Sequence, residues 1–296
     1  MLKTLQLLLF CVIIQLEVLD MPDFLYSFNE DVMSNPSNEH FRLHSHSEYE
    51  IYMFLSGDSK YVVEGKNYEL SHGDIIIIRK HEMHRVFHNS NKEYHRLVIM
   101  ISPDFFKKYH CEEFENAFWD KKNRIGNRIS AHIVRSSGLY DAIMRLKKYS
   151  DNFTLPHTAI VDSIMVEILY LINGISTFES ADTSNKTIKN VINYINNNFT
   201  DEITLEMLCE QFYVSKYHLC RIFKEVTGLT VQGYIRQKRL TLVTELKKEG
   251  KTLTEAALTA GFKNYSSFYR AYLNRYNASP NQSPLIRKSN HSMLHN

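Results

Sequence analysis

The sequence is poor in the residues that build several common sites. Its 296 residues include 4 cysteines, and none has the C-x-x-C spacing typical of a zinc site or a disulfide framework. Its 10 glycines form neither a Gly-rich phosphate-binding loop nor a nucleophile elbow. The apolar run Leu7–Ile14 is interrupted by Gln15 and Glu17 before it could span a membrane. These absences argue against nucleotide-binding enzymes, serine hydrolases and membrane-spanning proteins, and they predict free thiols in a reducing cytoplasm.

The charges are distributed unevenly, although the formal net charge is only +2. From Lys186 onward the chain carries 16 Lys/Arg against 8 Asp/Glu, whereas the preceding residues carry 19 against 25. A basic C-terminal part attached to an acidic body indicates an anionic polymer as partner. A merely solvated basic surface is the alternative.

The C-terminal part contains one pattern twice. The stretch Thr252–Pro280 predicts a short helix, a sharp turn at Gly261 and a second helix capped by Asn264. The same pattern occurs earlier in the chain. Its residues align with those of the second copy at an offset of 48 up to the turn and of 49 after the turn, so that Arg221 aligns with Arg270. We interpret the two copies as helix-turn-helix motifs that are joined by a helix over 230–248. Tyr213 stands where the second copy has Gly261, so the first turn is open to a different type.

This double motif resembles the DNA-binding domain of AraC/XylS-type bacterial transcription regulators. The resemblance covers about residues 187–288 and implies that two recognition helices enter successive major grooves. The matching residues are Ser215, Leu219, Arg221, Phe223, Lys224, Gly228, Tyr234 and Ile235 in the first copy, and Ala257, Gly261, Phe262, Phe268, Arg270, Tyr272, Ser279 and Pro280 in the second.

Helix phase places a polar face outward on each recognition helix. Lys and Arg can donate to phosphates or guanine, and Tyr and Cys can contact thymine methyl groups or form hydrogen bonds. An internal salt bridge is the alternative for Arg221 and Arg270. The predicted DNA-binding residues are Lys216, Tyr217, Cys220, Arg221 and Lys224 on the first helix and Tyr265, Ser266, Tyr269 and Arg270 on the second.

Residues 21–105 predict many short strands, as in a small barrel or jelly roll. The motif His44-x-His46-x-x-x-Glu50, with His84 further on, resembles the metal motifs of the cupin barrel. The second of those motifs is degraded here, and AraC-type regulators commonly keep such a remnant without a metal. We therefore predict an effector pocket at these four residues, with no metal and no cofactor. Polar residues lining a barrel mouth, or a metal-binding cupin enzyme or metal sensor, are the alternatives.

Residues 106–180 predict helices, and the apolar stripe over 155–177 is wide enough to be either fully buried or shared with another subunit. The family resemblance favours a dimerisation helix. Residues 181–186 are expected to be a linker and residues 289–296 a disordered tail. We expect translation to start at Met21, which would leave the apolar leader 1–20 outside the protein, with a weak membrane anchor as the alternative.

The sequence thus predicts an α+β protein of two domains, a cupin-like β-barrel with following helices and then an all-α domain. The expected function is that of a cytoplasmic, effector-responsive activator of transcription rather than an enzyme. The expected partners are double-stranded DNA, a small-molecule effector, a second copy of the chain and RNA polymerase, with no membrane partner. A carbohydrate-like effector is one option, and a response to temperature or pH through the 14 histidines is another.

Overall fold

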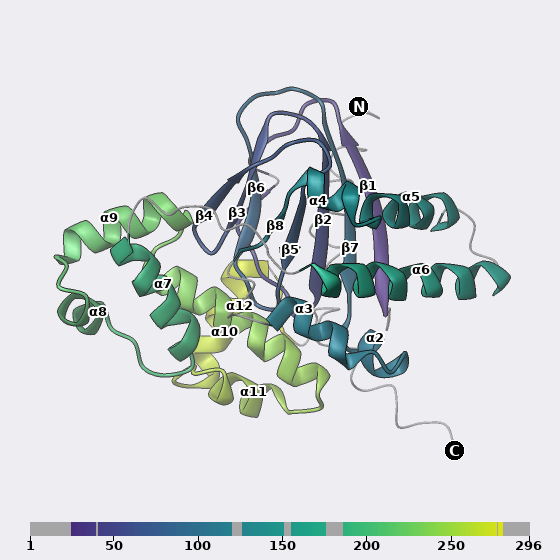
Figure 1. The fold of residues 1–296 in the computed structure, drawn as a ribbon. Helices are drawn as coiled ribbons and strands as arrows, with labels where there is room; N and C mark the ends of the chain where they lie inside the picture. Colours follow the sequence, from purple (N-terminus) through teal and green to yellow (C-terminus); the bar gives the residue numbers. More distant parts are fainter. Residues whose placement is uncertain are drawn as a thin grey trace, which may run out of the picture. The chain divides into compact units, whose positions relative to one another are not determined.

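The computed structural model describes residues 25–39, 41–119, 126–150, 155–175, 186–276 and 278–280 (Figure 1). The chain divides into two compact units, one made of Asp23–Arg42 with Glu48–Asp182 and the other containing Leu43–Ser47 with Thr183–Asn296. The predicted leader, tail and nearly all of the predicted linker lie outside the described residues. No helix in the described ranges has the length and apolarity that crossing a membrane requires.

The first unit contains two antiparallel sheets (Figure 1). The larger has the order β1-β7-β2-β5-β8 and the smaller the order β4-β3-β6. The strands are β1 (Tyr26–Met33), β2 (Tyr49–Ser56), β3 (Ser59–Val63), β4 (Lys66–Glu69), β5 (Ile75–Ile78), β6 (His84–His88), β7 (Tyr94–Ile101) and β8 (Arg128–Ile129).

The predicted barrel is not closed, because no ladder joins the two sheets in the part of the chain that the structure describes. The sheets pack face to face instead. Tyr52 and Phe54 of β2 and Tyr61 and Val63 of β3 belong to one buried apolar cluster, as the alternation of side chains along strands requires. Two of the four edge strands, β4 and β8, have only four and two residues, so they offer little backbone for further pairing. The result is an open sandwich with a cupin-like strand content.

A tight hairpin joins β3 and β4. Val63 pairs with Lys66, which leaves Glu64 and Gly65 as a two-residue turn. Both have positive φ, 50° and 75°, and such turns match the twist of the strands that they join.

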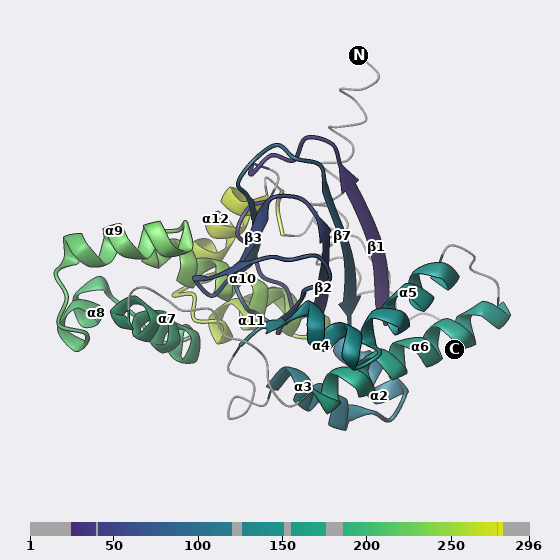
Figure 2. The same ribbon diagram turned by 45° about the horizontal axis from the view of Figure 1, so that its top comes forward.

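Helices cover the outer face of the larger sheet, and Figure 2 shows α5 and α6 side by side there. Residues of β2, β5 and β7 that point away from the sandwich, such as Ile51 and Ile77, pack with buried residues of these helices. Most of the wide stripe of α6 is used in this packing, although Ile160 and Tyr170 stay exposed. The helices are α2 (Pro103–Lys108), the 3-10 helix η1 (Glu112–Glu115), α3 (Asn116–Trp119), α4 (Ala131–Ser136), α5 (Leu139–Ser150) and α6 (Leu155–Gly174).

The second unit is helical, and polar caps begin several of its helices. Thr204, Ser215, Thr230 and Thr252 each accept a backbone N–H from three residues further on. Asn264 accepts the N–H of Ser267 at 2.9 Å, as predicted. The helices are α7 (Lys186–Asn198), α8 (Leu205–Gln211), α9 (Lys216–Thr227), α10 (Val231–Lys248), α11 (Leu253–Thr259) and α12 (Tyr265–Tyr276), so α8–α9 and α11–α12 form the two predicted motifs.

The two turns have the same left-handed backbone despite their different residues. Tyr213 has φ 51° and Gly261 has φ 91°. The Tyr213 side chain is 97% exposed, so it meets no obstacle. A Cβ at Gly261 would lie 2.2 Å from the carbonyl oxygen of Thr200. Glycine is therefore required at the second turn by close packing as well as by its φ angle, which the sequence alone did not reveal.

We expect Gly261→Ala to lower the free energy of unfolding by about 3–5 kcal/mol, from left-handed strain of about 1–2 kcal/mol plus overpacking. The matched control is Gly250→Ala, because Gly250 has φ 96° but open space around a Cβ. The control should lose only the strain contribution of about 1–2 kcal/mol. Urea unfolding of the full chain, followed by circular dichroism, measures both. Equal losses in the two variants would refute the close-packing argument.

Candidate nucleic-acid interface and effector pocket

The outward face of α9 carries the five residues predicted to contact DNA. Lys216, Tyr217, Arg221 and Lys224 are exposed and Cys220 is half-buried. The opposite face is anchored by residues such as Leu219 and Phe223, both fully buried. The predicted face is thus presented to solvent, with Tyr217 79% exposed.

The outward face of α12 is more apolar than that of α9. Ser266 and Arg270 are exposed, whereas Tyr265 and Tyr269 are half-buried. The Tyr265 ring packs 5.6 Å from the Phe268 ring, and burial, with a smaller contribution from Tyr269, raises the pKa of Tyr265. Leu273 occupies the position that corresponds to Lys224 at the offset of 49. Tyr265 therefore anchors α12 as well as lining its outward face.

Ion pairs on α9 are weak. The Lys216 ammonium lies 2.8 Å from Glu206, and Arg221 lies 3.5 Å from Glu225 on its own helix. All four side chains are more than half exposed, and exposed pairs contribute about 0–1 kcal/mol. The salt bridge considered as an alternative role for Arg221 is therefore a weak surface pair with Glu225. A DNA phosphate could replace Glu225 as the partner of Arg221. No ion pair joins Arg270 to another residue of the described ranges.

A basic pocket lies beside α12, and Arg270 is its one lining residue that the sequence predicted to contact DNA. It has a volume of about 440 Å³, and its lining includes Arg236 and Arg239 of α10, Lys263 before α12, and Arg270. Arg239 is committed to the fold, because its guanidinium donates to the carbonyl oxygens of Phe199 and Asp201 at 2.7 Å. The other three cations are exposed. Such a group of cations suits a phosphate oxygen. The comparison of the two sequence copies could not identify this pocket, because Arg236 belongs to the helix that joins the copies.

In the β-rich unit, Glu50 and His84 are buried and form a defined pair. The Glu50 carboxylate accepts a hydrogen bond from the Tyr61 hydroxyl at 3.0 Å and lies 3.3 Å from Nε2 of His84. Nδ1 of His84 lies 2.7 Å from the carbonyl oxygen of Glu82 and must donate to it. Nδ1 therefore carries a proton, and a neutral His84 would have its lone pair on Nε2.

The four residues of the predicted effector pocket divide between the two units. His44 and His46 belong to the unit that contains the helical part, whereas Glu50 and His84 belong to the β-rich unit. Imidazole and carboxylate groups are donors that suit a transition metal, so the residue types fit such an ion in their chemistry.

Two family models match the chain. A model of the AraC-like ligand-binding domain matches residues 33–147, and a model of a helix-turn-helix domain matches residues 208–283. The chain belongs to the AraC family of transcription regulators. It is a DNA-binding regulator, and the AraC family consists of regulators rather than enzymes.

The chain is similar to several known proteins at low identity. The HTH-type transcriptional activator RhaS of Salmonella typhimurium is 24% identical over 243 residues, which cover 80% of this chain and 85% of RhaS. ToxT from Vibrio cholerae is 15% identical, covering 87% of this chain and 97% of ToxT, with a TM-score of 0.37. The DNA-binding domain of AdpA, solved with a target DNA, is 18% identical over 32% of this chain and 87% of that domain, with a TM-score of 0.31.

We expect Lys224→Ala and Lys263→Ala to weaken DNA binding by this AraC-family chain about equally on all sequences. Each removes one exposed charge suited to a phosphate, so the slope of log affinity against log salt should fall by about one unit. Lys216→Ala should have a smaller effect, because its ammonium is paired with Glu206. Lys248→Ala, at the exposed end of α10, is the control. Fluorescence anisotropy over a range of salt concentrations measures the slope, and an unchanged slope in both test variants would exclude these phosphate contacts.

Proposed function

We propose that the chain is an effector-responsive transcription activator that reads two successive major grooves with α9 and α12. The repeated outward face carries this proposal. Residues at the same phase on both helices, related by an offset of 49, are polar or aromatic except at Leu273, and they are exposed or half-buried, whereas their opposite faces are buried. A short supporting helix and a left-handed turn precede each face, which is the geometry of a helix that enters a groove.

The joining helix α10 supports the two-groove arrangement. Its 18 residues span about 27 Å at the rise of an α-helix. One turn of B-DNA separates successive major grooves on one face by about 34 Å, which the turns at both ends of α10 bring within reach. Much of α10 is buried, including Tyr234, Leu240 and Val243, so it holds the two motifs as a rigid connector.

The β-rich unit is the proposed effector-binding part, as the match to the AraC-like ligand-binding domain supports. The proposed active form is a cytoplasmic homodimer that recruits RNA polymerase. Ile160 and Tyr170 of α6 are 44% and 62% exposed, and exposed apolar residues on this helix suit pairing with a second copy. The curated relatives are activators, which supports activation rather than repression.

We expect Tyr217→Ala and Tyr265→Ala to change base preference at two separate positions, by about 1–3 kcal/mol each. These positions should lie about 10 base pairs apart, because α10 fixes the separation of the two readers. Tyr265→Ala should also lower stability, since Tyr265 packs on Phe268. Selection of bound sequences from a randomised duplex library measures the preferences, with wild type as reference. Altered positions that fall within the same few base pairs would contradict the two-groove arrangement.

A metal-responsive regulator is the second candidate, and the motif His44-x-His46-x-x-x-Glu50 with His84 favours it by its donor chemistry. A bound transition metal would supply a fixed positive charge. If the effector is instead an organic molecule, we expect the purified protein to contain no stoichiometric metal. His46→Ala should then leave both the metal content and the fold unchanged. Elemental analysis of both proteins decides the matter, because stoichiometric iron, manganese or zinc that is lost in His46→Ala would establish the second candidate instead.

A further inference from the structure

Two of the three cysteines that the structure describes belong to the first helix-turn-helix motif. Cys209 lies on α8 and Cys220 on α9, and both are half-buried free thiols. The two helices lie side by side in both views of the ribbon (Figures 1 and 2). The thiols therefore belong to neighbouring helices of one unit, and one of them is on the helix that is proposed to read DNA.

An ion pair shows that the faces of α8 and α9 that carry the cysteines meet. Glu206 lies three residues before Cys209, and therefore on the same face of α8. Lys216 lies four residues before Cys220, and therefore on the same face of α9. The Lys216 ammonium lies 2.8 Å from the Glu206 carboxylate. This contact between the two faces brings both cysteines to the space between the helices.

The repeat places Cys209 at the crossing of the two helices. Its carbonyl oxygen accepts the backbone N–H of Val214 at 3.1 Å, which closes the end of α8. At the offset of 48, Cys209 aligns with Ala257 of the second motif. Ala257 is fully buried in one cluster with Phe268 of α12. The position thus faces the recognition helix in the second motif, and the contacts of α8 with α9 give Cys209 the same place in the first.

The two thiols also influence each other electrostatically. Burial, and next the Cys220 thiol, raises the pKa of the Cys209 thiol. Both thiols contribute to the raised pKa of Lys216, whose main cause is the hydrogen bond with Glu206. Electrostatic effects between groups close to solvent are screened beyond about 10 Å, so the two thiols and the ammonium are near neighbours.

Cys220 is the thiol that an oxidant in solution meets first. It lies on the outward face of α9, among the exposed residues Tyr217, Arg221 and Lys224. Cys209 lies at the helix crossing, and its raised pKa leaves less of it in the reactive thiolate form. The pair thus combines an accessible thiol with a second thiol close behind it, which is the arrangement of a redox-sensing cysteine and its resolving partner.

We propose that Cys209 and Cys220 are a modification site, at which a peroxide joins the supporting helix and the recognition helix of the first motif by a disulfide. With hydrogen peroxide, the Cys220 sulfur takes one oxygen as the O–O bond breaks, which gives a sulfenic acid and one water. The Cys209 sulfur then attacks the sulfenic sulfur, so that the S–S bond forms and a second water leaves. The two sulfurs together lose two electrons, and one peroxide is reduced to two waters.

The disulfide acts on the face of α9 that is proposed to contact DNA. Both thiols are free in the structure, so closing an S–S bond of about 2.05 Å draws α9 toward α8 and turns the Cys220 side chain away from the outward face. Loss of a base contact should weaken DNA binding at least about fivefold. This effect rests on the proposed reading of DNA by α9, whereas formation of the disulfide does not.

Peptide mapping of the full chain tests the disulfide directly. Trypsin cuts after Lys189, Lys216 and Arg221, which separates the two cysteines into peptides 190–216 and 217–221. The protein is treated with hydrogen peroxide, its remaining free thiols are alkylated, and it is digested without reductant. Mass spectrometry should find the two peptides joined, and dithiothreitol should separate them.

Fluorescence anisotropy, with a duplex selected from the randomised library, measures the effect on DNA. Peroxide should weaken binding by the wild type at least about fivefold, and dithiothreitol should restore it. Cys209→Ala is the test variant, because the second motif already has Ala257 at this position. It should bind as the reduced wild type does, and it should lose both the cross-link and the response to peroxide. Cys111→Ala, in the β-rich unit, is the control and should respond as the wild type does.

Several outcomes contradict the proposal. Peptides 190–216 and 217–221 that stay separate after peroxide would overturn it, as would a Cys220 that is oxidised only to the sulfenic or sulfonic acid. A disulfide between two chains on a non-reducing gel, or joined peptides with unchanged DNA affinity, would overturn it as well. Failure of the reduced wild type to bind any duplex would contradict the proposed function instead, and the peptide map would still decide whether the disulfide forms.

Discussion

The left-handed backbone at the turn of each motif determines the direction of the recognition helix. At Gly261 this turn also lies against the backbone of Thr200, in the connection between α7 and α8. The turn of the second motif therefore packs directly against the segment that precedes the first motif. Arg239 reinforces this packing from α10 through its two hydrogen bonds to carbonyl oxygens of the same connection. The relative direction of α9 and α12 therefore depends on backbone contacts rather than on the side chains that face DNA.

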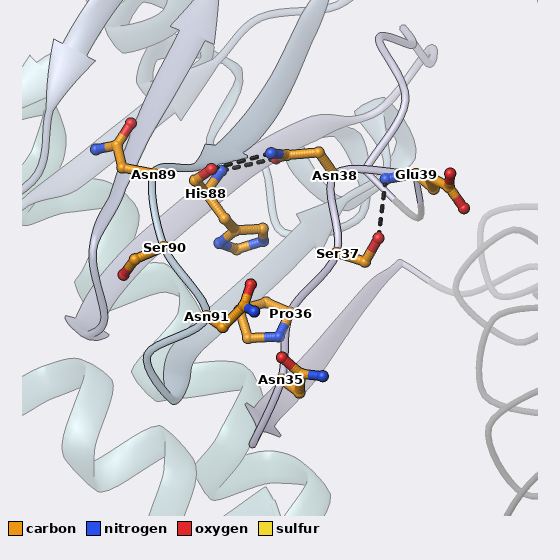
Figure 3. A pocket seen from close by; sticks show the side chains of 9 residues that line it. All are labelled: Asn35, Pro36, Ser37, Asn38, Glu39, His88, Asn89, Ser90 and Asn91. Carbon is orange, nitrogen blue, oxygen red and sulfur yellow. Dashed lines mark hydrogen bonds between the residues drawn. The ribbon is translucent and has the colours of Figure 1, made fainter.

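In the β-rich unit, the constraint is the aromatic layer between the two sheets. Tyr52, Tyr61 and Tyr94 belong to this layer and are buried to at least 98%, and their hydroxyls pair with other buried polar groups. The layer forces nearby ionisable groups either to be paired, as in the 2.7 Å contact between Arg96 and Asp31, or to be neutral, as in His88 (Figure 3), where burial lowers the pKa to about 4. Specific small-molecule recognition needs polar groups with fixed directions, and this layer provides them.

Local patterns in the sequence predicted the helices of the two motifs, the cap at Asn264 and the outward faces, because each depends on residues within a few turns of one another. The two sheets fit the jelly-roll form of the prediction rather than a closed barrel. Local patterns could not decide between these forms, since pairing of sheet edges is decided by strands distant in the sequence. The left-handed Tyr213 was missed because propensity disfavours it, whereas the solvent around its side chain permits it. Arg236 and Lys263 lie outside the repeated face, so only their surroundings in the fold identify them.

The two motifs carry their charge in different places. On α9 the cations Lys216, Arg221 and Lys224 belong to the outward face itself, whereas α12 has Leu273 where α9 has Lys224. The second motif places its remaining cations at the flank, at Arg236 and Lys263. Phosphates run along both sides of a groove and base edges occupy its floor, so flanking cations leave the outward face of α12 to its aromatic residues. On the proposed function, the second motif would therefore leave more of its outward face to contacts with base edges.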